Sequence, residues 1–488
     1  MTDRHNDQGR NAAWRQTLRD AMPAKERTAI PRTVMPQLDP AYRITTNEEV
    51  NQGLTAEQAV TEATRCLDCP TPTCIEGCPV NIAIPDFIKN IQRGEVLRAA
   101  AILKQTSALP AVCGRVCPQE RQCESRCIYN KMKKEPVAIG YLERFAADRE
   151  RAAGPAPVPA DIVRNGIRVA VAGSGPAGLS FAGDMARRGF DVDVFEALHE
   201  IGGVLKYGIP EFRLPNSVVD AELDNLRSLG VKFHTNTVMG KTLSYDDLLN
   251  MGFRGIFVAS GAGLPRFMGI PGENLSGVMS SNEYLTRINL MGAGRPGSAT
   301  PVLKGRRVAV IGGGNTAMDS VRTARRMGAE RAMIIYRRGL EEMPARVEEV
   351  HHAKEEGVEF LTLCNPVRYE GDESGRVCRM YVQRMELGEP DASGRRSPVP
   401  IEGAVDEIEV DQVIVSVGVS PNPLIPDNIA GLNVTPRGTV AVVGNHCSSI
   451  PTIYAGGDIV RGGATVILAM GDGRQAAASM AEKLLENA

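Results

Sequence analysis

Two segments of the chain carry the hydrophobic pattern of a buried strand followed by a glycine-rich turn and a helix. Residues 167–172 (IRVAVA) and 306–311 (RRVAVI) are continuous apolar runs, and a further strand with glycines lies at 452–458. Strands that alternate with helices predict parallel sheets. The expected fold class is therefore α/β, with two Rossmann-like domains built on parallel sheets.

The pattern before residue 160 is different. Residues 1–50 are polar and interrupted by prolines, which predicts an arm that becomes ordered only against a partner or the body of the protein. Residues 55–58 (TAEQ) form a capping box that opens a short helix. Residues 86–107 carry apolar positions at helical spacing, and the Pro- and Ala-rich stretch 152–160 is typical of a linker. A mainly helical domain is expected here.

These patterns divide the chain into four segments. Residues 1–160 are expected to form the arm and the helical domain. Residues 161–300 and 438–488 are expected to form two parts of the first nucleotide-binding domain, and residues 301–437 the second nucleotide-binding domain between them.

Composition excludes several classes of protein. The formal net charge is -2 and aromatic residues make up 5% of the chain, which argues against nucleic-acid binding. No apolar run approaches the ~18 residues that a membrane helix needs. The first residues also lack the apolar core of a signal peptide. We therefore expect no nucleic acid, no membrane and a cytoplasmic location.

The first glycine-rich turn has the context of a dinucleotide fingerprint. Gly173, Gly175 and Gly178 follow a strand and open a helix, which brings the helix N-terminus to a pyrophosphate. The next strand ends in Glu196, whose carboxylate would bind ribose hydroxyls and repel a 2′-phosphate. This site is expected to bind FAD or NAD. The alternative is a glycine-rich turn with a purely structural role.

The second glycine-rich turn differs from the first at the end of the strand that follows it. Its residues are Gly312, Gly314, Asn315, Thr316 and Ala317, and the following strand ends in two arginines, Arg337 and Arg338. Guanidinium groups at this place favour a 2′-phosphate, so the turn is expected to bind NADPH. The alternative is that both arginines are ordinary solvated surface charges.

Two nucleotide folds of opposite charge in one chain indicate a flavin reductase. The expected pair of Rossmann-like nucleotide-binding domains resembles that of glutathione reductase. The C-terminal glycines and Asp458 fit the remaining contact with FAD, and a helix from about residue 464 would direct its N-terminus at the flavin. We expect the hydride chemistry to be carried by FAD and NADPH, with no catalytic side chain. The expected FAD-binding residues are Gly173, Gly175, Pro176, Ala177, Gly178, Glu196, Gly203, Leu205, Gly261, Gly457, Asp458 and Thr465.

Eight of the eleven cysteines lie between residues 66 and 127, which indicates metal binding in a cytosolic chain. Structural zinc usually uses separated C-x2-C pairs, whereas these cysteines crowd into two runs that resemble those of ferredoxins. We expect two [4Fe-4S] clusters. Interleaving as in two-cluster ferredoxins would join Cys66, Cys69, Cys74 and Cys127 in one set. Cys78, Cys117 and Cys123 would form the other, with Cys113 as the fourth by count.

The remaining candidates have plainer interpretations. Cys364, Cys378 and Cys447 are scattered and are expected to be ordinary small buried residues. His351 and His352 are adjacent on an expected helix, cannot share a face, and are expected at the surface.

The chain as a whole resembles the small (β) subunit of bacterial NADPH-dependent glutamate synthase. The resemblance rests on residues 66–88 (CLDCPTPTCIEGCPVNIAIPDFI), 113–127 (CGRVCPQERQCESRC), 202–215 (GGVLKYGIPEFRLP) and 312–319 (GGGNTAMD). The same module occurs in dihydropyrimidine dehydrogenase and in large subunits of ferredoxin:NADP oxidoreductases.

The resemblance implies an electron-input function. Electrons from NADPH would pass through FAD and the clusters to FMN on a large (α) subunit, which makes glutamate from glutamine and 2-oxoglutarate; a hetero-oligomer is expected. The family also has a non-cysteine cluster ligand, which falls on Glu143 here, so Cys113 and Glu143 remain alternatives. Two other functions stay open: a reductase that serves ferredoxin or another oxidoreductase, and a non-catalytic redox-sensing module.

Overall fold

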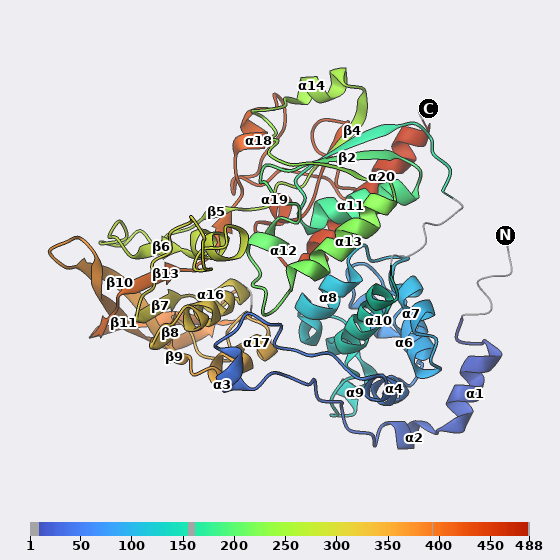
Figure 1. Ribbon diagram of the computed structural model, residues 1–488, viewed down its shortest axis with the longest axis horizontal. Coiled ribbons are helices and arrows are strands. Elements are labelled where there is room, and N and C mark those ends of the chain that lie inside the picture. The colour runs from blue at the N-terminus through green and yellow to red at the C-terminus, as the bar shows by residue number, and fades with distance from the viewer. Residues whose placement is uncertain (1–8, 155–161, 393, 487–488) are drawn as a thin grey trace.

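The computed structural model describes residues 9–154, 162–392 and 394–486. Residues 155–160 of the predicted linker lie outside these ranges. The described chain forms a helical part, shown in blue and teal in Figure 1, and two α/β parts that lie above and to the left of it. No helix among the described residues is long and apolar enough to cross a membrane.

The helical part contains short helices that the local sequence explains. Thr55 caps α4 through the predicted capping box with Gln58. The predicted helical stretch 86–107 is two helices, because the chain turns at Gly94 with a φ of +88°. The helices are α1 (Ala13–Ala21), α2 (Ala24–Arg27), α3 (Pro40–Arg43), α4 (Ala56–Arg65), α5 (Thr73–Glu76), α6 (Ile84–Gln92), α7 (Val96–Leu103), α8 (Pro110–Val116), η1 (Gln119–Arg121), η2 (Glu124–Arg126), α9 (Ile128–Lys131) and α10 (Ile139–Ala153).

The first α/β part is a parallel five-stranded sheet in the order β15-β4-β1-β2-β3. The predicted strand at 167–172 is β1, and it pairs on either side with β2 and β4. The strands are β1 (Arg168–Ala172), β2 (Asp191–Phe195), β3 (Lys232–His234), β4 (Phe253–Val258) and β15 (Ile453–Ala455). The helices are α11 (Pro176–Arg187), α12 (Val204–Tyr207), α13 (Asn216–Ser228), α14 (Tyr245–Asn250), α18 (Leu424–Asp427), α19 (Asp458–Arg461) and α20 (Val466–Glu486).

The second α/β part is another parallel sheet, in the order β6-β13-β7-β8-β9. Its strands are β6 (Val278–Ser280), β7 (Arg307–Ile311), β8 (Arg331–Tyr336), β9 (Glu359–Thr362) and β13 (Gln412–Val415), and its helices are α15 (Ser281–Leu285), η3 (Thr286–Leu290), α16 (Asn315–Arg326) and α17 (Val347–Glu355). An antiparallel sheet of β10 (Cys364–Gly371), β11 (Val377–Pro390) and β12 (Arg396–Glu409) extends from it. The short pair β5 (Leu264–Pro265) and β14 (Val419–Ser420) completes the described strands.

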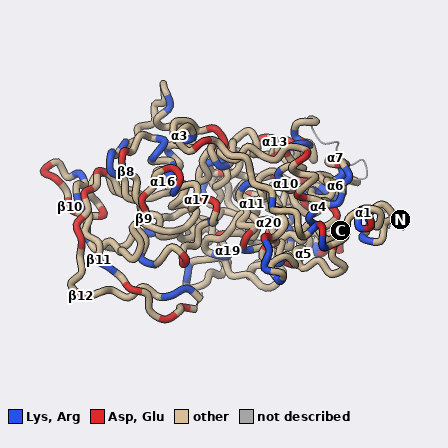
Figure 2. Tube along the Cα trace, turned by 90° about the horizontal axis from the view of Figure 1, so that it is seen from below, with Lys and Arg blue, Asp and Glu red and all other residues tan. Residues whose placement is uncertain are grey.

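The helical part and the first sheet share one hydrophobic core. Buried Leu109 and Val112 of the helical part belong to the same cluster as Phe181 of α11 and Leu226 of α13. The second sheet has separate clusters on its two faces. The cysteine-rich segments are therefore fixed rigidly against the first nucleotide fold. Charged residues of both signs are spread over most of the chain (Figure 2).

The described part of the N-terminal arm packs on the body of the protein. Arg15 and Arg19 of α1 form ion pairs with the buried carboxylate of Asp68. The chain then runs along the lower edge of the molecule to α3, which lies beside α17 (Figure 1). There Arg43 pairs with Glu355 and Glu356 at 2.8 and 2.9 Å. The arm thus connects the helical part with the second sheet.

Candidate functional site

A large cavity lies where the two glycine-rich turns face each other. Its volume is about 1220 Å³, and it extends from the first turn to residues of α16. Ten of the twelve residues expected to bind FAD line it: Gly173, Gly175, Pro176, Ala177, Glu196, Gly203, Gly261, Gly457, Asp458 and Thr465. The other two lie elsewhere: Leu205 is fully buried in the core, and Gly178 packs α11 on β1.

Two glycines of the first turn are required by close contacts. A Cβ on Gly178 would stand 2.1 Å from the carbonyl oxygen of Gly173. Gly173 itself has a φ of +108°, and a Cβ there would stand 2.4 Å from the carbonyl oxygen of Ala259. Around Gly175, by contrast, the space is open. The turn is therefore tight where it packs and open where a pyrophosphate would approach.

Glu196 stands at the end of β2, as the sequence predicts. Its Oε2 accepts hydrogen bonds from the backbone N–H and hydroxyl of Ser174 at 3.0 and 2.6 Å. Its Oε1 accepts one from the N–H of Leu198 at 2.9 Å. These bonds hold the carboxylate at the cavity wall, where its remaining lone pairs fit ribose hydroxyls.

The C-terminal segment closes the opposite side of the cavity. Asp458 accepts a hydrogen bond from the N–H of Ala464 at 3.0 Å, and burial raises its pKa. Thr465 directly precedes the 21-residue helix α20, and Ala464, Thr465 and Val466 all line the cavity. The N-terminal end of a long helix therefore faces the space that a flavin ring would fill, where its dipole favours negative charge.

The second glycine-rich turn reaches the cavity through two of its predicted residues. Asn315 and Thr316 line the cavity, whereas Gly312, Gly314 and Ala317 do not. Sequence reasoning missed a buried ion pair here: Arg213 Nη1 donates to Asp319 Oδ2 at 2.9 Å, and both residues line the cavity. This pair ties the segment 202–215 to α16. Both residues lie in the quoted motifs, but their pairing has no local sequence signal.

The two arginines after β8 have different surroundings. Arg337 is exposed. Arg338 is buried and donates to Asp391 Oδ2 at 2.5 Å and to the carbonyl oxygen of Arg396 at 2.8 Å. Only Arg337 therefore presents its guanidinium to a ligand in this arrangement.

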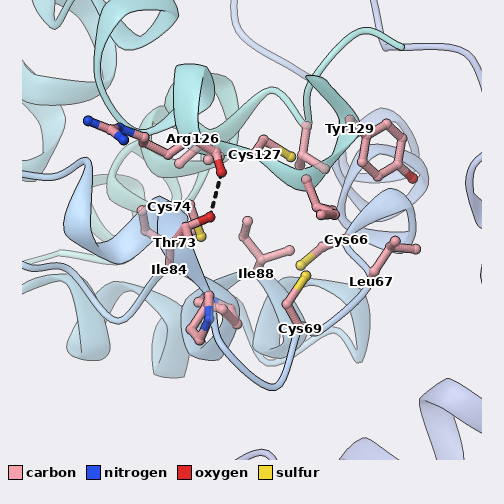
Figure 3. Close-up of a pocket in the computed structure, with 15 residues that line it drawn as sticks. Cys66, Leu67, Cys69, Thr73, Cys74, Ile84, Ile88, Arg126, Cys127 and Tyr129 are labelled. Atoms are coloured by element: carbon pink, nitrogen blue, oxygen red, sulfur yellow. Dashed lines mark hydrogen bonds between the residues drawn. The ribbon is translucent and has the colours of Figure 1, made fainter. Parts of the chain in front are cut away.

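Four cysteines from both runs surround one pocket. Cys66, Cys69, Cys74 and Cys127 line it together with apolar residues such as Ile84 and Ile88 (Figure 3). Burial and the neighbouring thiols raise the pKa of Cys69 to about 11, and burial also raises the pKa of Cys74 and Cys127. Four thiolates in so confined a space repel one another, so a cationic metal centre would be needed to hold them.

The chemistry of this donor set fits an iron-sulfur cluster. Among the described residues, no three His, Cys, Asp or Glu side chains converge as they would around a single ion. The four thiols are instead distributed around the wall of one pocket. Thr73 braces the pocket by donating from its hydroxyl to the carbonyl oxygen of Arg126 at 2.7 Å.

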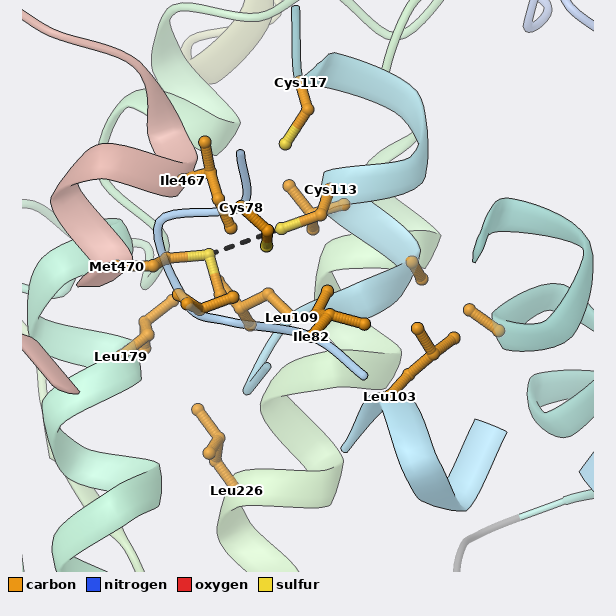
Figure 4. Packing of buried hydrophobic residues seen from close by; sticks show 14 of the residues in the cluster. Cys78, Ile82, Leu103, Leu109, Cys113, Cys117, Leu179, Leu226, Ile467 and Met470 are labelled. Atoms are coloured by element: carbon orange, nitrogen blue, oxygen red, sulfur yellow. Dashed lines mark hydrogen bonds between the residues drawn. The ribbon is translucent and has the colours of Figure 1, made fainter. Parts of the chain in front are cut away.

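The other four cysteines form a second group, which is fully buried. Cys78, Cys113, Cys117 and Cys123 are each at most 9% exposed. Burial, with smaller contributions from the nearby Glu143 and Cys113, raises the pKa of Cys78 to about 11. A hydrogen bond with Cys113, together with burial, raises the pKa of Cys117. Figure 4 shows Cys78, Cys113 and Cys117 packed beside Met470 of α20.

Glu143 lies within this second group. It is buried on α10, and its Oε1 makes no hydrogen bond with any described residue. Burial raises its pKa to about 8. The Sγ of Cys113 instead lies 3.5 Å from the Sδ of Met470. A buried carboxyl without a partner is costly, so Glu143 fits a missing metal ligand.

The second cysteine group adjoins the cavity. Val116 and Pro118, which flank Cys117, line the cavity wall. Gln122 Nε2 also lies 3.5 Å from Thr465 Oγ1. Sequence reasoning did not identify these contacts, because they join segments more than 300 residues apart.

The prediction for His352 is wrong. Its side chain is 1% exposed beside Glu349, and burial lowers its pKa to about 4, whereas His351 is 67% exposed. The arm and α16 cover this face of α17, which the sequence pattern did not reveal. Of the scattered cysteines, Cys364 is buried, and Cys378 and Cys447 are half-buried.

Two segments of the chain match two known families. Residues 43–155 match the family described as dihydropyrimidine dehydrogenase domain II, 4Fe-4S cluster, and residues 167–473 match pyridine nucleotide-disulphide oxidoreductases. The fold and site thus define an NADPH-dependent oxidoreductase with an N-terminal iron-sulfur domain.

Relatives define the family more closely. The chain is 37% identical to the glutamate synthase [NADPH] small chain of Escherichia coli over 88% of this chain and 92% of that protein. It is also 36% identical to the putative oxidoreductase UacF of E. coli, over 96% of this chain and 75% of UacF. Identity to the NADP(+)-dependent formate dehydrogenase subunit beta of Moorella thermoacetica is 38%, over 85% of this chain and 60% of that subunit. The chain belongs to the family of glutamate synthase small chains and related oxidoreductases.

Solved structures agree on the fold. Mycobacterium tuberculosis FprA in complex with NADPH is similar with a TM-score of 0.55 and 22% identity, over 66% of this chain and 85% of FprA.

Proposed function

We propose that this chain is the electron-input subunit of an NADPH-dependent glutamate synthase. Similarity along nearly the full length of the E. coli small chain carries this proposal. When bound, FAD would accept a hydride from NADPH and two [4Fe-4S] clusters would carry single electrons. The partner would be a large subunit with FMN, on which glutamine and 2-oxoglutarate yield two glutamates.

The chain's own residues would bind and orient these groups. The first turn, with Glu196, would hold the pyrophosphate and ribose of FAD. Asn315 and Thr316 would position NADPH in the same cavity, with Arg337 at its 2′-phosphate. The contacts of Val116 and Pro118 with the cavity support transfer from the flavin to the second cysteine group first.

We assign the cluster ligands from the two groups of side chains. Cys66, Cys69, Cys74 and Cys127 would hold one cluster, which supports the interleaved arrangement. Cys78, Cys117, Cys123 and Glu143 would hold the other. The unpartnered buried oxygen of Glu143 favours it over Cys113, whose sulfur packs on Met470.

A second candidate function is electron input to a different oxidoreductase. The match to UacF over 96% of this chain and the match to a formate dehydrogenase subunit support this second candidate. In this case the module and its cofactors are the same and only the acceptor differs.

The native complex distinguishes the two candidates. It would be isolated anaerobically from source cells by a tag on this chain, and NADPH oxidation would be followed with and without glutamine plus 2-oxoglutarate. Oxidation that requires both substrates and yields glutamate establishes the first candidate. Oxidation that ignores them but is fast with ferredoxin establishes the second. The absence of NADPH-dependent flavin bleaching contradicts both and leaves a non-catalytic module.

A further inference from the structure

The two cysteine groups differ in their access to solvent. All four cysteines of the second group are buried, whereas Cys66, Cys69, Cys74 and Cys127 are each half-buried. Electron tunnelling between proteins requires close approach of the two redox centres. A partner can therefore approach the first pocket more closely than the second group.

The rim of the first pocket is basic. The chain that contains Cys127, residues 126–134 (RCIYNKMKK), carries four cations and no acidic residue. Arg126 lines the pocket itself, and Lys131 is the last residue of α9. We call Arg126, Lys131, Lys133 and Lys134 the basic rim; all four side chains are exposed.

The charges of the basic rim are not neutralised within the described residues. The side chains of Arg126, Lys131 and Lys133 make no hydrogen bond or ion pair there, and Lys134 donates only to the carbonyl oxygen of Thr28, at 2.6 Å. Less exposed cations of the same domain do form ion pairs: Arg32 pairs with Glu124 and Arg65 with Glu62. Among the described residues 120–140, Glu135 is the only exposed acid.

The basic rim also offers an apolar contact. Met132, between Lys131 and Lys133, is 40% exposed. A flexible methionine surrounded by cations is suited to a protein surface rather than to a small anion, because it can pack against apolar side chains of varied shape.

We propose that the basic rim is the docking surface for the electron-accepting partner, a protein whose redox centre lies beneath an acidic face. This inference rests on the proposed function of the chain as an electron-input module. Each NADPH gives two electrons, so two one-electron acceptors are reduced while NADP⁺ and one proton are released. Long-range attraction between the two faces would speed association and orient the acceptor toward Cys66 and Cys127.

Charge reversal at the basic rim tests this inference. The cofactor-loaded protein and the variant K131E/K133E would reduce an acidic [2Fe-2S] ferredoxin with NADPH under anaerobic conditions, at increasing KCl. We expect kcat/KM for the parent to fall as KCl rises. We expect the variant to lose at least about tenfold at low salt and most of its salt dependence. Reduction of basic cytochrome c should rise in the same variant.

The matched control changes the net charge equally at a distant place. In K232E/K241E, two exposed lysines of the first α/β part are reversed, and ferredoxin kinetics should stay at parental values. If K131E/K133E reduces ferredoxin like the parent, or if both variants lose equally, the docking surface is wrong. Bleaching of bound flavin by NADPH is measured in each protein. Its absence from the parent would contradict the proposed function, whereas normal bleaching with unchanged ferredoxin kinetics contradicts the basic rim alone.

Discussion

Glu143 and Cys113 make the clearest contrast between single residues. Both are buried in the second cysteine group, but the carboxyl oxygen lacks a partner and the thiol packs on a thioether. We expect Glu143→Ala to lose the second cluster and about half of the bound iron. Cys113→Ala should keep both. Iron content and the EPR spectrum after reduction measure the result, and loss of a cluster in Cys113→Ala alone would reverse the assignment.

Arg337 and Arg338 differ in a second testable way. Arg337→Ala should lower kcat/KM for NADPH by about 10- to 100-fold, because a charge-assisted hydrogen bond to the 2′-phosphate is lost. The value for NADH should stay unchanged. Arg338→Ala removes the bond with Asp391, so it should change kcat/KM for NADPH and for NADH by the same factor. Steady-state kinetics with both cofactors measure the discrimination, and unchanged preference in Arg337→Ala would refute the 2′-phosphate assignment.

His352 links a single side chain to acid stability. Burial lowers its pKa to about 4, and the charges of Arg322 and Arg43 act in the same direction. The carboxylates of Glu349 and Glu348 oppose this shift. The imidazole of His352 is therefore protonated near pH 6.5 in the unfolded chain, but only near pH 4 in the folded chain. Stability should fall by about 3 kcal/mol as pH falls across this window.

Denaturant unfolding at pH 7 and pH 4 measures this effect. His352→Gln should flatten the dependence on pH, and the exposed neighbour variant His351→Gln should retain it. Equal slopes in the two variants would contradict the role of burial.

At the scale of elements, the arm is held by buried charge. Arg43 of α3 is 1% exposed and meets two carboxylates of α17 and its C-terminal end. Arg43→Ala leaves Glu356 paired with Arg322 and Arg326, so the loss of its charge-assisted hydrogen bonds should destabilise the fold by about 1–3 kcal/mol. Arg306→Ala, which breaks the exposed pair with Glu330 at 2.8 Å, should leave the unfolding midpoint unchanged. Similar midpoints for both variants would show that α3 does not anchor the arm.

Local sequence was sufficient for elements with local causes. The capping box at Thr55, the strand β1 and the turn at Gly173 each depend on neighbouring residues, and each was predictable. The antiparallel sheet β10–β12 and the burial of His352 depend on contacts across the chain. The orientation of Arg338 toward Asp391, 53 residues away, belongs to the same class. Such pairings carry no local period or motif, so one sequence cannot reveal them.

At the scale of the whole molecule, the cavity and the two cysteine groups would form one path for electrons. Cys78 belongs to the first run in sequence but to the second group in space. Cys78→Ser should therefore disturb the second cluster and spare the first, as EPR can resolve. NADPH should still bleach the flavin, while reduction of external acceptors should fall at least about tenfold. Loss of the first cluster instead would contradict the interleaved arrangement.

The first sheet takes its edge strand from far along the chain. β15 pairs with β4 across nearly 200 residues, and Gly457, Asp458 and Thr465 follow it at the cavity wall. During synthesis, the complete second sheet leaves the ribosome before these residues do. Flavin loading must therefore wait until translation has passed residue 465, and until then β4 exposes an unpaired strand edge.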